Sequence, residues 1–95
     1  METANMGLNA RESEFFGAYM KLLSEYQDMD GRFGLWRIHK HFDINDDEVL
    51  HETSDAGNRV STVNVIKKQD LPNHAFVSQW IVSSSGTKPG SWCCD

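Results

Sequence analysis

The feature that most constrains the fold is a single change in the spacing of the apolar residues. Between residues 9 and 28 they recur every three or four positions, which is typical of an amphipathic helix. From residue 33 to residue 83 short stretches of alternating apolar and polar residues are separated by polar turns, which is typical of half-buried strands. One change of this kind predicts an α+β fold with one helix at the N-terminal end.

The predicted helix has a start signal and a stop signal. Asn9 is followed three residues later by Glu12, the spacing of a capping box. Beyond residue 28, Gly31 is suited to the left-handed conformation in which helices commonly end. The apolar side of this helix is predicted to pack on the sheet and to supply much of the core. It carries Phe15, Phe16, Tyr19, Met20, Leu22, Leu23 and Tyr26.

Four strands are predicted over residues 33–42, 48–53, 59–66 and 75–83, with turns rich in Asp, Asn and Gly between the first three and Pro72 in the last loop. Short connections favour pairing between neighbours in the chain, so we expect a four-stranded antiparallel β-meander. A small curved half-barrel fits the same pattern equally well.

The chain of 95 residues has room for a single domain, residues 1–95. Within it we expect a loose leader over residues 1–8, the helix over 9–28, the antiparallel sheet over 33–83 and a tail over 84–95. The tail is rich in Ser, Gly, Thr, Lys and Pro, and its first part is expected to be mobile. Trp92 is the residue that could return to the body of the protein.

The charge of the chain argues against two classes of partner. Nine Lys and Arg residues are outnumbered by fourteen Asp and Glu residues, and the formal net charge is −5. Affinity for nucleic acid and for anionic lipid comes from clustered basic residues, which this sequence lacks. We therefore expect no nucleic-acid partner and no membrane partner.

Two further observations concern location. No basic region followed by an apolar stretch begins the sequence, and no stretch is apolar over the length of a membrane span. Cys93 and Cys94 are neighbours, make no ordinary unstrained bridge with each other and have no third cysteine to pair with. These features predict a cytoplasmic protein whose fold does not depend on disulfides.

Three histidines form the one cluster with a geometric argument for chemistry. His39 and His41 are two residues apart on the first predicted strand, so they share a face. If the turn closes the first hairpin symmetrically, His39 lies opposite His51 on the second strand. Three imidazoles on adjacent strands can hold Zn²⁺ with an open fourth position, which supports hydrolysis or hydration. A shift of the strand register by one residue would instead place His51 on the other face, and all three histidines would then be ordinary solvent-facing residues.

The sequence contains no glycine-rich phosphate loop and no nucleophile elbow. It favours a small, acidic, non-enzymatic binding or regulatory protein that contacts a protein or a small-molecule ligand through the open face of its sheet. Two alternatives stay open, namely the zinc site of His39, His41 and His51, and an acidic mimic of nucleic acid that inhibits a nucleic-acid-binding protein. Exposed sheet edges also predict a homodimer.

Overall fold

The computed structural model describes residues 6–95. Contacts divide the chain into two compact units, Met1–Arg37 and Ile38–Asp95, and the single domain expected from the chain length stays a prediction. Most of the leader expected over residues 1–8 lies outside the described residues. In chain order, the described elements are α1 (Ala10–Glu25), the short 3₁₀ helix η2 (Gln27–Met29), β1 (Glu48–Asp55), β2 (Val60–Lys67), the 3₁₀ helix η3 (Lys68–Asp70), β3 (Phe76–Ser83) and β4 (Gly86–Cys93). One helix longer than a single turn and one sheet make this an α+β protein, as predicted.

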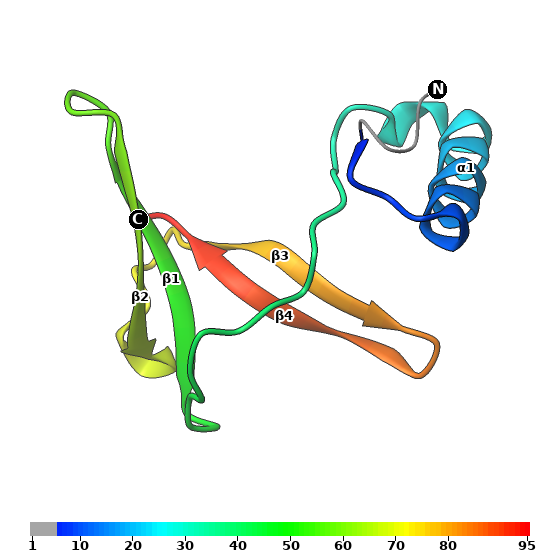
Figure 1. Ribbon diagram of the computed structural model, residues 1–95. Coiled ribbons are helices and arrows are strands. Elements are labelled where there is room, and N and C mark those ends of the chain that lie inside the picture. The colour runs from blue at the N-terminus through cyan, green and yellow to red at the C-terminus, as the bar shows by residue number, and fades with distance from the viewer. Residues whose placement is uncertain (1–5) are drawn as a thin grey trace. The chain divides into compact units, whose positions relative to one another are not determined.

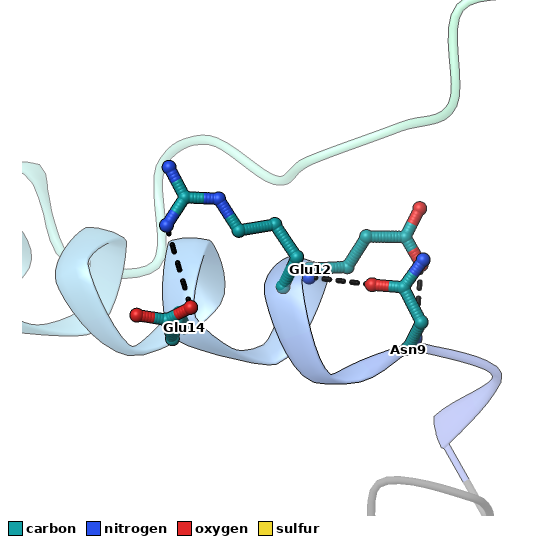
Figure 2. Close-up of polar contacts among 4 residues, drawn as sticks. Asn9, Glu12 and Glu14 are labelled. Carbon is teal, nitrogen blue, oxygen red and sulfur yellow. Dashed lines mark hydrogen bonds and ion pairs between the residues drawn. The ribbon is translucent and has the colours of Figure 1, made fainter.

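Helix α1 begins with the predicted capping box (Figure 2). The side-chain oxygen of Asn9 accepts a hydrogen bond of 2.8 Å from the backbone N–H of Glu12, and the Glu12 carboxylate accepts one of 3.0 Å from the backbone N–H of Asn9. These two bonds satisfy N–H groups that have no partner within the helix. The helix ends earlier than predicted, with Tyr26 as its C-cap, and Gly31, whose φ is 80°, lies beyond η2 and not at the end of α1.

The apolar side of α1 is less enclosed than the sequence predicts. Phe16, Tyr19 and Leu23 are half-buried, and Phe15 and Tyr26 are exposed. The helix lies in the first compact unit and all four strands lie in the second. The predicted packing of the helix on the sheet therefore stays a prediction.

The first predicted strand, over residues 33–42, is wrong. Between Met29 and Glu48 the chain forms no helix and no strand. At His51, the residue predicted to lie opposite His39, β1 is already paired on both sides. His51 is paired with Asn64 of β2 on one side and with Trp92 of β4 on the other.

Strands β1 and β2 form the hairpin that the sequence predicts. They pair antiparallel over their whole length, from Glu48 opposite Lys67 to Asp55 opposite Val60. The Asp55 carboxylate closes the turn, accepting hydrogen bonds of 3.2 Å and 2.8 Å from the backbone and side-chain amides of Asn58. Arg59, directly before β2, adopts a positive φ of 57°.

The predicted tail is the largest correction to the fold. Residues 86–93 form β4, which pairs antiparallel with β3 and parallel with β1, so the strand order is β2-β1-β4-β3. Figure 1 shows β4 returning from the β3–β4 turn and ending beside β1. The sheet is mixed and is neither the predicted antiparallel meander nor the half-barrel. The sequence pattern failed because β4 is built from residues such as Pro89 and Gly90 that are typical of loops.

A disulfide joins Cys93 to Cys94 across a cis peptide bond, which the sequence analysis did not predict. Because the two residues are neighbours, this bond encloses no other part of the chain. It therefore does not tie distant strands together.

The most buried residues of the sheet lie where β1 and β4 meet. Within residues 6–95 no hydrophobic residue is buried, and the two buried residues are His51 and Ser91, with exposed fractions of 7% and 5%. His51 is paired with Trp92, the residue that follows Ser91.

Among the described residues 6–95, no helix is both long and apolar enough to span a membrane.

Candidate functional site

The structure does not assemble the predicted three-histidine cluster. His39 and His41 lie in the irregular segment before β1, with their ring centres 5.2 Å apart and their planes nearly perpendicular. His51 lies within β1 and is paired with β2 on one side and with β4 on the other. The hairpin that would place His39 opposite His51 is absent. Over the described range 6–95 no group of three His, Cys, Asp or Glu residues is arranged to hold a metal ion, so the zinc site stays a prediction without structural support.

His51 instead has a structural role. Its Nε2 atom is 2.7 Å from the backbone carbonyl oxygen of Cys94, so in the tautomer with a proton on Nε2 the imidazole donates a hydrogen bond to that oxygen. The bond connects β1 with the residue that follows β4. A buried imidazole that keeps one hydrogen bond avoids part of the cost of leaving a polar group unpaired.

The two faces of the sheet can be assigned from the strand registers. Side chains alternate along a strand, and paired residues on neighbouring strands share a face. His51, Trp92 and Val77 are consecutive partners across β1, β4 and β3, so they define one face. We call it the His51 face. Glu52, Cys93 and Phe76 are the corresponding partners on the opposite face, which we call the open face.

The open face carries the exposed apolar side chains of β3. The β3–β4 register is irregular around Gln79 but is the same before and after it, so Trp80 and Val82 share the open face with Phe76. Phe76 is 57% exposed and Val82 is 68% exposed, whereas Val77 and Ile81 on the His51 face are half-buried. The alternation in the sequence predicted this division of β3 into two faces.

The open face continues onto the β1–β2 hairpin. Leu50 pairs with Val65, and Glu52 pairs with Val63, which is 53% exposed. The Glu52 carboxylate accepts a hydrogen bond of 3.0 Å from the hydroxyl of Ser61 on the same face. The open face therefore combines aromatic and aliphatic side chains with a few polar groups, and it spans all four strands.

An ion pair connects the open face with the segment before β1. The ammonium group of Lys67, opposite Glu48, lies 2.7 Å from the Asp47 carboxylate, and the backbone N–H of Lys68 donates to the Asp47 carbonyl oxygen. The hydrogen bond from Lys67 lowers the pKa of Asp47, and the same contact raises the pKa of Lys67. Both groups are solvent-exposed, so this pair orders the start of β1 more than it adds stability.

A second apolar surface lies within the first compact unit. An open groove of about 690 Å³ runs between α1 and the segment around Trp36, and Phe15, Phe16 and Leu35 contribute to its walls. A guanidinium nitrogen of Arg37 approaches the Glu12 carboxylate at 3.7 Å beside this groove. Its walls hold no arrangement of histidine or cysteine that would bind a metal, and their carboxylates are the capping and ion-pair groups of α1.

The chain matches no protein family model, no curated protein sequence and no solved structure at a significant level. The surfaces described above are therefore the basis for the function proposed below. Sequence analysis found the exposed side of β3 but missed how far the open face extends, because that depends on β4 joining the two hairpins.

Proposed function

We propose that this chain is a small non-enzymatic binding protein that contacts another protein through the open face of its sheet. The observation that carries the proposal is the exposure of Phe76, Val82 and Val63 together on one side of one sheet. Apolar side chains that share one exposed surface are a common mark of a protein–protein contact. The cytoplasm predicted from the sequence is the compartment in which we expect this contact.

The chemistry of the open face favours a protein partner over a small ligand. Small molecules prefer concave sites that enclose most of their surface. The open face is instead the side-chain layer of a four-stranded sheet, with Phe76 at one end and Val63 at the other. Aromatic anchors within a polar rim are typical of protein interfaces, and here Glu48 and Glu52 supply polar groups on the β1 part of the face.

Site-specific photo-crosslinking in cells tests the proposal. A benzoylphenylalanine introduced at Phe76 should give one discrete adduct with another protein, and excess wild-type chain should compete for it. The matched control carries the same group at Thr62, an exposed residue of β2 on the His51 face. It should give no such adduct.

Charge substitutions then link the adduct to the face itself. Val63→Asp places a carboxylate within the open face and should abolish the adduct formed from position 76, whereas Thr62→Asp on the neighbouring residue should leave it unchanged. Adducts of equal yield from positions 76 and 62, or no adduct from position 76, would contradict the proposal.

A further inference from the structure

The sheet has two edge strands whose outer sides pair with no strand among residues 6–95. The order β2-β1-β4-β3 places β2 at one edge and β3 at the other. An edge strand presents a row of backbone N–H and C=O groups that can pair with another extended chain. Both edges are eight residues long, so each is long enough to support such pairing.

The two edges differ in the charges that protect them. Natural edge strands are commonly blunted by charged residues or proline. Strand β2 ends in Lys67 and follows directly after Arg59. Strand β3, Phe-Val-Ser-Gln-Trp-Ile-Val-Ser, contains neither a charged residue nor a proline. The one irregularity of β3 is the register shift around Gln79, so by its lack of charge and proline β3 is the less protected edge.

We propose that a second copy of this chain pairs antiparallel with the outer edge of β3, with Gln79 of both copies on the twofold axis. An isologous contact of this kind closes on itself as a dimer. In this register Phe76 of one copy lies opposite Val82 of the other, and Val77 lies opposite Ile81. These two pairs bring apolar side chains together on both faces of the sheet, and Ser78 lies opposite Trp80 between them.

The register and the charges indicate that the strand pairing with the outer edge of β3 comes from a second copy of this chain. Phe76 and Val82 are two of the most exposed apolar residues of the sheet, and this pairing covers each with the other. The other edge strand, β2, ends in Lys67, so its self-pairing would place an ammonium group within the contact. The inference concerns the edge of the sheet and does not depend on the proposed function of the open face.

Light scattering of the full chain tests the dimer. We expect wild-type protein to be dimeric at high micromolar concentration and to dissociate on dilution. Gln79→Lys places two ammonium groups at the axis and should weaken association at least tenfold. Thr62→Lys, the matched change on β2, should leave association unchanged. A monomeric wild-type chain at high micromolar concentration would overturn the proposal, as would a dimer weakened by Thr62→Lys but not by Gln79→Lys.

A mixing experiment tests the position of the axis, and hydrogen exchange of the wild-type chain covers the case in which Gln79→Lys affects folding. Equal amounts of the Gln79→Lys and Gln79→Glu variants should form a heterodimer, because opposite charges then meet at the axis. Hydrogen exchange of wild-type protein adds an independent measurement, since amides of β3 should gain protection as concentration rises. Failure of the mixture to associate, together with concentration-independent exchange in β3, would overturn the proposal. An adduct between two identical chains bears on this dimer, whereas an adduct with a different protein bears on the proposed function.

Discussion

The two compact units are held together by contacts of different range. In the unit that ends at Arg37, the main element is α1, whose backbone hydrogen bonds and capping box join residues three or four positions apart. In the unit from Ile38 to Asp95, β1 depends on β4, and the bond from His51 reaches Cys94, 43 residues along the chain. Damage to a helix end should therefore stay local, whereas damage to β4 should spread through the whole sheet.

Removal of β4 should have the largest effect, because it should unfold the sheet and leave the helix in place. A chain ending at Ser83 lacks the strand that pairs with both β1 and β3. Strand β3 then has no partner, and an isolated β1–β2 hairpin is marginally stable in water. We expect the strand signal in circular dichroism to be largely lost and the helical signal to remain. A truncated chain that keeps the cooperative unfolding transition of the sheet would contradict this.

Trp92→Ala should have the next largest effect. Trp92 is half-buried beside His51 at the junction of β1 and β4. Its truncation should lower the free energy of unfolding by about 2 kcal/mol, less than for a fully buried tryptophan. The control is Thr87→Ala, an exposed position of the same strand that should change the free energy by less than about 0.5 kcal/mol. Urea titration followed by a strand-sensitive signal measures both, and equal effects would show that Trp92 is not part of the junction.

Asn9→Ala should produce a smaller effect that is confined to the helix. The change removes the acceptor for the Glu12 N–H and should cost the helix about 1 kcal/mol. Asn9→Ser keeps a capping oxygen and should retain most of the stability. Hydrogen exchange can follow both units at once, and faster exchange in β1 as well as α1 would contradict the local character of this contact.

The ion pair of Asp47 and Lys67 should give the smallest effect, visible as a dependence on pH. Because the pKa of Asp47 is lowered in the folded chain, its stabilisation is present above the ordinary carboxyl pKa and is lost as the pH falls through the lowered value. The pKa of Lys67 is raised, so its share is present below the ordinary lysine pKa and is lost as the pH rises through the raised value.

Asp47→Asn should remove the acid-side part of this dependence and leave the exchange rates of α1 unchanged. Carboxyl chemical shifts measured by NMR across the acidic range give the pKa of Asp47 directly. An ordinary carboxyl pKa for Asp47 in the folded chain would show that the contact with Lys67 does not persist in solution.

The range of the contacts also explains which elements the sequence predicted. The capping residues of α1, the hairpin of β1 and β2, and the alternation within β3 are encoded by residues close together in the chain, and each was predicted near its observed place. Residues 33–42 alternate like a strand, yet at His51, where they were predicted to pair, β1 is already paired on both sides. Conversely, β4 has the composition of a loop, and only its pairing with two other strands makes it a strand.

The open face could likewise be predicted only where it depends on residues close together in the chain. The exposed apolar side of β3 follows from the alternation around Phe76 and Val82. The extent of the open face does not, because it requires the parallel pairing of β1 with β4. The three-histidine cluster depended on a hairpin between residues 33–42 and β1, so a single wrong strand pairing removed the geometric argument for it.

The most direct test of the account is the set of backbone contacts made by His51 in solution. Nuclear Overhauser effects should connect His51 with Trp92 and Asn64, in the parallel and antiparallel registers of β4 and β2. These contacts would establish β4 as a central strand and the open face as a surface that spans four strands. Contacts between His51 and His39, without contacts to Trp92, would restore the hairpin of the first two predicted strands and contradict the account.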